Sequence, residues 1–153
     1  MKVKQGLLAV KDVNGFLKKY GSKAAFINAE YVVDENHVYF AAKKAIKAWK
    51  EGRRVARTLP LEILLYSAAT RQIRDAMKMG IKEGVNKVIA VFLEDTEPEG
   101  FEERNVLETG KMSKEKFERI VNFFNISETE LDVAERRLNL LVRERIVLFD
   151  INK

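Results

Sequence analysis

Hydrophobic positions near the start of the chain alternate between short extended runs and a stretch with helical spacing. Residues 3–10 read Val-Lys-Gln-Gly-Leu-Leu-Ala-Val and show little helical periodicity, which predicts a first strand. Asp12 can cap a short helix that ends near Gly21. A brief apolar segment, residues 25–28, follows this helix. The pattern therefore begins with an extended segment, a short helix and a second apolar segment.

A longer amphipathic helix is predicted after Asp34, which is a favourable N-cap residue. Gly52 suits the position just beyond the end of this helix. The apolar positions with a 3.6-residue period are Val38, Ala41, Ala42, Ala45, Ile46 and Trp49. Trp49 lies on this apolar face, so we interpret it as a core residue; a platform for base stacking is the alternative.

Two apolar runs further along are interpreted as buried strands. Residues 61–66 read Leu-Glu-Ile-Leu-Leu-Tyr and follow a proline, and residues 87–93 are rich in β-branched and aromatic side chains. Between them, Thr70 can cap a helix over residues 71–79 that stops at Gly80. Strand, helix and strand in this order predict a βαβ unit.

The last third of the chain begins with an acidic loop, residues 94–103, which contains six acidic residues and no basic one. An edge strand is predicted at 104–109, and Ser113 can cap a helix that runs through Phe124. Ser127 and Glu130 form a capping-box pattern for a last helix. One face of that helix carries Leu131, Ala134, Leu138, Leu141 and Arg145. Residues 146–149 extend it as helix or strand, and the pattern does not decide between the two.

These elements predict a mixed α/β (α+β) fold. We expect a central mixed or antiparallel sheet of about four to five strands packed with helices. No repeat, low-complexity tract or Pro/Gly-rich linker divides the chain, so residues 1–153 are interpreted as one domain. No apolar run approaches the ~20 residues of a membrane span, and the first residues are too polar for a secretory signal. A cytoplasmic protein without a membrane partner is expected.

The chemistry of the side chains argues against an enzyme that acts alone. The chain has no cysteine, which excludes disulfides and thiolate zinc sites, and it has no phosphate-binding glycine loop or nucleophile elbow. The single histidine, His37, is interpreted as a surface or packing residue in the first turn of its helix. No catalytic residue, metal or cofactor is expected.

Two acidic features have alternative interpretations. The acidic loop is interpreted as a solvated loop, because its carboxylates lack the regular spacing of a cation site. Glu62 lies inside an apolar run, where a carboxylate is unusual. It is interpreted as a side chain that caps backbone groups or pairs with an arginine; an acid with a raised pKa is the alternative.

Charge is distributed unevenly along the chain. Residues 1–93 carry 18 lysine and arginine residues against 8 aspartate and glutamate, whereas residues 94–153 carry 10 against 15. An anionic partner for the first part is therefore expected, although an ordinary basic surface is the alternative. Arginine suits single-stranded RNA because it binds phosphate and stacks on unpaired bases. The candidate RNA-binding residues are Lys43, Lys47, Lys50, Arg53, Arg54, Arg57, Arg71 and Arg74.

Three segments, taken in their order and spacing, resemble a known family. They are residues 26–29 with Val33 and Asp34, residues 37–45, and residues 57–66 continuing to Arg71-Gln72-Ile73-Arg74-Asp75-Ala76. They are similar to the small-subunit family of the KEOPS/EKC complex, the family of the PRPK-binding protein TPRKB. The resemblance covers about residues 25–95 and favours an archaeal member. The first 20 residues and the acidic loop depart from the family pattern.

This resemblance implies a mixed α/β fold and a non-catalytic subunit. Family members bind and stimulate the atypical kinase/ATPase of KEOPS, and archaeal members bind the single-stranded 3′ CCA end of tRNA. They thereby support threonylcarbamoyladenosine modification, whose chemistry belongs to a different, metal-containing subunit. Other KEOPS subunits are contacted indirectly. The kinase contact is assigned to apolar side chains of the helix after Arg71 and of the C-terminal segment: Ile73, Met77, Leu141, Val142 and Ile146.

Two other functions remain open at this point. One is a scaffold or regulator of the kinase that touches only protein, in which case the basic positions are solvated surface. The other is a small-ligand-binding or catalytic α/β domain, which the predicted βαβ unit would favour because helix N-termini can hold anions.

Overall fold

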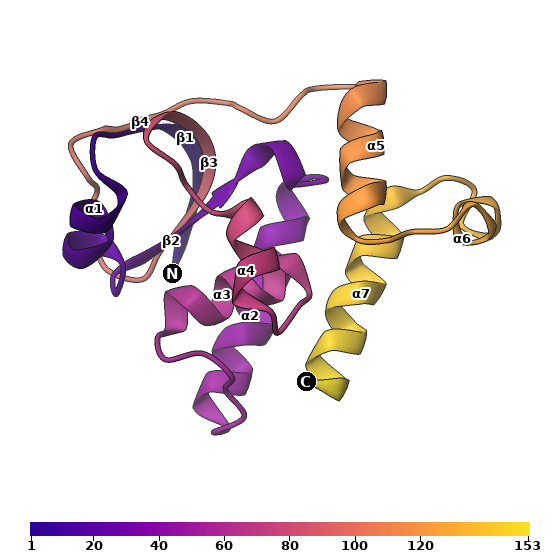
Figure 1. The fold of residues 1–153 in the computed structure, drawn as a ribbon, viewed down its shortest axis with the longest axis horizontal. Helices are drawn as coiled ribbons and strands as arrows, with labels where there is room; N and C mark the ends of the chain where they lie inside the picture. The colour runs from indigo at the N-terminus through magenta and orange to yellow at the C-terminus, as the bar shows by residue number, and fades with distance from the viewer.

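The computed structural model describes residues 1–153 and is built around one antiparallel sheet (Figure 1). The strand order is β2-β3-β1-β4. The strands are β1 Lys2–Val10, β2 Ala24–Asn28, β3 Gly84–Phe92 and β4 Phe101–Glu103. The long pair β1 and β3 runs in register from Lys2 opposite Phe92 to Val10 opposite Gly84. The predicted mixed α/β fold, with a mixed or antiparallel sheet of about four to five strands, is therefore confirmed: the sheet is antiparallel and has four.

Seven α-helices and two short 3₁₀ helices complete the fold. The α-helices are α1 Val13–Tyr20, α2 Glu35–Lys50, α3 Leu59–Ala68, α4 Ile73–Ala76, α5 Lys114–Phe123, α6 Glu128–Val133 and α7 Leu138–Asn152. The 3₁₀ helices are η1 Ala29–Tyr31 and η2 Met77–Met79. None of these helices combines the length and the apolar composition that crossing a bilayer requires.

The helices cover the two faces of the sheet unequally. Helix α1 lies alone on one face, while α2, α3 and α4 lie on the other face with α5 and α7 beyond them (Figure 1). Side chains of neighbouring β2 residues point to opposite faces, so Phe26 packs towards α1 and Ile27 packs into the main core. The main core contains 28 buried residues, and the core under α1 contains seven.

Helix α3 corrects the prediction that residues 61–66 form a strand. Thr58 caps the helix, since its Oγ1 accepts a hydrogen bond from Leu61 N at 3.3 Å, and Pro60 occupies the first turn, where its missing N–H costs nothing. The helix is buried on every side, from Glu62 through Ala68, so no polar face marked its period. The predicted βαβ unit is also wrong, because every strand pair is antiparallel.

Two further predictions differ from the structure near the sheet. Thr70 Oγ1 accepts from Gln72 N, which makes a local turn, and α4 begins only at Ile73 and continues into η2. The edge strand is Phe101–Glu103 rather than residues 104–109. β4 approaches β1 closely at Gly6, where a Cβ atom would lie 2.5 Å from the Glu102 carbonyl oxygen. Glycine is therefore needed at this crossing.

The C-terminal region contains two helices where the pattern suggested one. Glu135 and Arg136 adopt positive φ angles of 53° and 59°, and these left-handed residues separate α6 from α7. Residues 146–149 are helical and lie within α7. The predicted caps Asp12, Asp34, Ser113 and Ser127 are confirmed, the last with the complete capping box to Glu130.

Candidate functional site

A surface of exposed cations, here called the basic surface, contains the eight residues predicted to bind RNA. They are Lys43, Lys47, Lys50, Arg53, Arg54, Arg57, Arg71 and Arg74, and all eight are exposed. Only Arg53 makes an ion pair: its guanidinium lies 2.9 Å from Glu51 Oε1 and 3.5 Å from Asp150 Oδ1. The other seven have no carboxylate partner, so an anion can bind them without displacing an internal ion pair.

Aromatic rings lie beneath two of these cations. The Arg54 guanidinium lies 4.5 Å from the centroid of the Trp49 ring, and Lys43 Nζ lies 5.4 Å from the Tyr39 ring centroid. Trp49 is half-buried and lies outside the main core. The prediction that Trp49 is a core residue is therefore wrong, because Arg54 rather than the protein interior covers its ring.

The basic surface has two parts that α3 connects. The lysines project from α2, whereas Arg71 and Arg74 precede and begin α4. Helix α3 packs against both α2 and α4, but these two make no extended contact with each other. Arg57 comes just before the Thr58 cap of α3 and stands between the two parts in the sequence.

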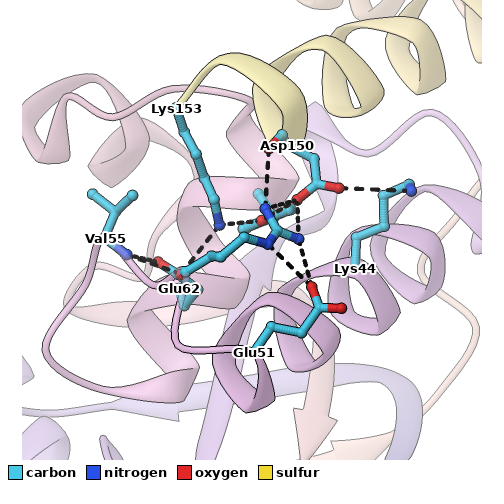
Figure 2. Close-up of polar contacts among 8 residues, drawn as sticks. Lys44, Glu51, Val55, Glu62, Asp150 and Lys153 are labelled. Atoms are coloured by element: carbon cyan, nitrogen blue, oxygen red, sulfur yellow. Dashed lines mark hydrogen bonds and ion pairs between the residues drawn. The ribbon is translucent and has the colours of Figure 1, made fainter.

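A buried polar cluster fixes the connection between α2 and α3 (Figure 2). The Glu62 carboxylate is fully buried and accepts hydrogen bonds from Val55 N and Ala56 N, each at 3.0 Å. Lys153 Nζ lies 3.7 Å from Glu62 Oε2 and donates to the Tyr66 hydroxyl. This confirms that Glu62 caps backbone groups, although the cation beside it is a lysine rather than an arginine.

The same cluster continues to the surface through Asp150. The Tyr66 hydroxyl donates to Asp150 Oδ1 at 2.5 Å, and the carboxylate of Asp150 also lies 3.5 Å from Arg53 and 3.8 Å from Lys44. Through Asp150, the last turn of α7 therefore contacts Tyr66 of α3, Lys44 of α2 and Arg53 in the connection between them (Figure 2).

Burial controls the protonation of this cluster. Burial raises the pKa of the Tyr66 phenol well above its usual range, and its hydrogen bond to Asp150 acts in the same direction. Burial also lowers the pKa of the Lys153 ammonium group, while Glu62 and Asp150 oppose that effect. Tyr66 therefore remains a hydrogen-bond donor rather than a nucleophile, and the cluster holds the backbone of the basic surface in place.

The apolar residues predicted to contact a partner fall into two groups. Ile73 and Met77 are exposed, by 52% and 42%. Leu141, Val142 and Ile146 are buried because α7 packs through them against α2 and α3, so their side chains do not form part of the surface of the chain. The prediction that these three residues contact a partner at the surface is therefore wrong, because they lie in the core.

The exposed apolar side chains of α7 were missed by sequence reasoning. Leu140, Leu148 and Ile151 are exposed by 42%, 44% and 70%, and they repeat at helical spacing on the side away from the core. We call them the α7 outer face. The helical spacing of these three residues can be read from the sequence, but only if residues 146–152 are assigned as helix.

An apolar pocket of about 390 Å³ opens at the free edge of the sheet, between α1 and α3. Leu17 of α1 and Met77 of η2 form part of its walls, and Ala24–Phe26 of β2 line one side. Its other apolar lining includes Pro60, Leu61, Leu64 and Ile81. Lys18 is the only charged residue that lines it.

His37 and the acidic loop have structural roles. His37 is buried, its Nδ1 accepts from Val33 N at 3.2 Å, and its Nε2 lies 2.8 Å from the Ser67 carbonyl oxygen, which identifies it as a packing residue. Carboxylates of the acidic loop pair with β1: Asp95 lies 3.1 Å from Lys2 and Glu97 lies 3.0 Å from Lys4. These pairs connect the loop to β1 at the surface of the molecule.

The exposed cations and the exposed apolar helix face are features of a protein that binds partners. Comparison with known proteins agrees with this class. Residues 9–149 match the family model described as kinase binding protein CGI-121, and the chain belongs to this family. A curated relative, the KEOPS complex subunit Cgi121 of Pyrococcus abyssi (strain GE5 / Orsay), is 44% identical over 59 residues. That match covers 38% of this chain and 34% of the relative.

Proposed function

We propose that the chain is a non-catalytic KEOPS subunit that binds and stimulates the kinase/ATPase of the complex and binds the 3′ CCA end of tRNA. It would thereby support threonylcarbamoyladenosine modification. The family description and the name of the Pyrococcus relative support the kinase and the complex as partners. The observation that carries the RNA part is the set of seven exposed cations without an internal carboxylate partner.

For the kinase, we propose the α7 outer face as the contact surface. Leu140, Leu148 and Ile151 are large apolar side chains left in water, and covering them with a partner is favourable because apolar area leaves solvent. The sequence resemblance assigns Ile73 and Met77 to the same kinase contact as the residues of α7. These two residues lie on a different part of the molecule, because α4 and η2 make no extended contact with α7.

For RNA, the basic surface supplies phosphate contacts and stacking groups. Arg57, Arg71 and Arg74 are unpaired guanidinium groups that can bind phosphates in a bidentate manner. Arg54 on Trp49 adds a guanidinium plane supported by a ring. Since the α7 outer face carries none of these cations, the two partners can be tested separately.

The kinase contact is tested by the double variant Leu148→Arg/Ile151→Arg. Placing charge on an apolar contact surface is expected to lower retention of the kinase subunit in a pull-down at least about tenfold, because the arginines would be desolvated without partners. The matched control is Val133→Arg, a residue on α6 that is 82% exposed. Retention that is equal in the double variant and the control would reject the α7 outer face as the kinase contact.

The RNA contact is tested by the charge reversal Arg71→Glu/Arg74→Glu. We expect weaker binding of intact tRNA, measured by filter binding or fluorescence anisotropy, with kinase retention preserved. The matched control is Arg136→Glu/Arg137→Glu, whose arginines pair with Glu128 and Glu135. tRNA lacking its CCA end should bind the unaltered protein more weakly than intact tRNA. If both results are absent while the kinase still binds, the protein-only scaffold is the correct function.

A further inference from the structure

A second pocket, of about 320 Å³, lies where β1, the first turn of α2 and the segment before α5 meet. We call it the Lys116 pocket. Its volume is at the lower end of the ~300–1,000 Å³ typical of small-ligand sites. Its apolar lining consists of three half-buried side chains, Val33, Leu107 and Met112. Its charged lining consists of Asp34, Glu35, Glu108 and Lys116.

Lys116 is a buried cation without a partner in the chain. It lies in the first turn of α5 and is 7% exposed, and its backbone N donates to Ser113 Oγ at 3.2 Å. The lysines that form ion pairs are four others, Lys2, Lys4, Lys44 and Lys153. Ser67 Oγ is the only side-chain polar atom that is both sealed from solvent and unpartnered, so the Lys116 ammonium group still reaches open space.

The position of Lys116 has an energetic cost that no internal contact offsets. Burying an ammonium group without an acceptor is unfavourable. Burial lowers the pKa of Lys116, and the strongest of the charges that oppose this effect is Glu108, which also lines the pocket. An anionic group that enters the pocket would give Lys116 the acceptor that the fold withholds.

The first turn of α2 supplies the opposite charge. Asp34 Oδ1 accepts from His37 N at 3.0 Å, and Glu35 Oε1 accepts from Gln5 Nε2 at 3.0 Å. The second oxygen of each carboxylate is free to accept from a ligand. A simple anion would be repelled by the carboxylates, and a simple cation would leave Lys116 unpaired. A small molecule that carries both charges satisfies both sides of the pocket.

The walls of the Lys116 pocket are held together by side chains that line it. Gln5 Oε1 accepts from Val106 N at 2.9 Å and from Leu107 N at 3.1 Å, while its amide nitrogen donates to Glu35. One residue of β1 thereby connects α2 to the segment before α5. Glu108 Oε2 accepts from Ser113 N at 3.1 Å and joins that segment to the start of α5. A site fixed in this way loses little freedom when a ligand binds.

We propose that the Lys116 pocket binds a small aliphatic α-amino acid as its zwitterion. The carboxylate of the ligand binds Lys116, its ammonium group binds the carboxylates of the first turn of α2, and its side chain contacts the apolar lining. The inference goes beyond the proposed function and does not depend on it, because the pocket includes no residue of the basic surface or of the α7 outer face.

The test uses three ligands that differ only in charge. L-Valine carries both charges, N-acetyl-L-valine lacks the ammonium charge, and L-valinamide lacks the carboxylate. Calorimetric titration at pH 7 compares the unaltered chain with Lys116→Met and with Glu35→Gln. The matched control is Lys114→Met, an exposed residue of the same helix turn that does not line the pocket. Thermal unfolding checks that each variant folds.

The unaltered chain and the control should bind L-valine about 10- to 100-fold more tightly than either analogue, because each analogue lacks one charged hydrogen-bonding group. Lys116→Met should lose this preference for valine over valinamide without a loss of thermal stability, since it replaces an unpaired buried charge with an apolar chain. Glu35→Gln should weaken valine binding while leaving N-acetylvaline binding nearly unchanged. The methyl signal of Met112 should shift when valine is added.

Three results overturn the inference. If the unaltered chain binds neither alanine, valine nor leucine at millimolar concentration, the pocket is not an amino-acid site. If valine binds Lys116→Met as tightly as it binds the control, the ligand lies elsewhere. If N-acetylvaline binds the unaltered chain as tightly as valine does, the pocket recognises a carboxylate alone. None of these results affects the binding of the kinase or of RNA, so the proposed function is tested separately.

Discussion

A buried polar residue, Glu62, fixes the connection between α2 and α3, which carries three arginines of the basic surface: Arg53, Arg54 and Arg57. Glu62 accepts hydrogen bonds from two consecutive backbone N–H groups, of Val55 and Ala56, and lies beside Lys153 Nζ. Glu62, Ala56 and the Lys153 ammonium group are removed from bulk water and Val55 is half-buried, so these groups depend on one another for their polar interactions. At this scale, one carboxylate determines the path of the chain between α2 and α3.

Glu62→Ala is expected to lower the free energy of unfolding by about 3–5 kcal/mol, because it leaves two N–H groups without their acceptor and the buried ammonium group of Lys153 without its neighbouring carboxylate. Glu62→Gln keeps one acceptor and should cost less. Urea unfolding measures both, with the exposed Glu118→Ala as the control. A loss for Glu62→Ala within 0.5 kcal/mol of the control, a typical size for a surface substitution, would contradict the role assigned to Glu62.

His37 makes stability depend on pH in a defined direction. Burial lowers the pKa of His37 to about 4 from 6.5. Below pH 6.5 the unfolded chain takes up a proton that the folded chain does not, so stability is complete above pH 6.5 and falls as the pH approaches 4. The loss is about 3 kcal/mol across this range. Thermal unfolding from pH 4 to 7 should show it for the unaltered chain and not for His37→Gln. Parallel curves for the two proteins would contradict it.

The relation between sequence and structure differs from one element to another. Elements with a polar side or a capping residue were predicted: β1, α1, α2 and α5. β3 was predicted as a buried strand from its β-branched and aromatic residues. The sequence of α3 predicts a strand because a helix buried on all sides shows no polar face to mark its period, and only Thr58 and Pro60 indicate a helix start. The apolar pocket could not be predicted, since its walls come from α1, β2, α3 and η2, which only the folded chain brings together.

The end of α5 and the helices α6 and α7 are joined by one arginine. Arg145 forms two hydrogen bonds to the Glu130 carboxylate, at 2.7 and 2.9 Å, and also donates to the carbonyl oxygens of Phe124 and Asn125. Hydrogen bonds from Arg145 and from Ser127 hold the pKa of Glu130 at about 2. The arrangement therefore persists wherever Glu130 is ionised.

Arg145→Lys is expected to lower the free energy of unfolding by about 1–2 kcal/mol, because an ammonium group cannot reproduce the planar, four-acceptor arrangement. Arg143→Lys, on an exposed neighbouring position, is the control. Combining Arg145→Lys with Glu130→Gln should cost less than the sum of the two single changes, since both remove the same interaction. Strict additivity would show that the two side chains do not act together.

At the scale of the whole molecule, carboxylates of the acidic loop form ion pairs within the fold, whereas most cations of the basic surface do not. Acidic loop carboxylates are held to Lys2 and Lys4 of β1, whereas seven of the eight cations of the basic surface have no such partner. The positive charge of these seven residues is therefore available at the surface rather than cancelled within the fold. Affinity for RNA that arises from this surface must depend strongly on ionic strength.

Replacing Arg57 and Arg74 by glutamine should make the salt dependence of RNA binding shallower. For a single strand, log K changes with log salt by about −0.7 for each phosphate contacted, so losing two contacts reduces the slope by about 1.4. The slope is measured by titrations at several salt concentrations. Lys2→Gln/Lys4→Gln, which removes cations already paired with acids, is the comparison. A slope that changes equally in both variants would contradict a localised RNA contact.

The single imidazole of the chain is also a built-in spectroscopic reporter. Because Nδ1 accepts from Val33 N, Nε2 must carry the hydrogen that reaches the Ser67 carbonyl oxygen, so nitrogen-15 spectra should contain one neutral Nε2–H tautomer. With no second histidine to overlap it, that resonance can be followed without assignment by mutagenesis. Its position during titration with the kinase or with RNA would report directly whether α2 and α3 keep their packing when a partner binds.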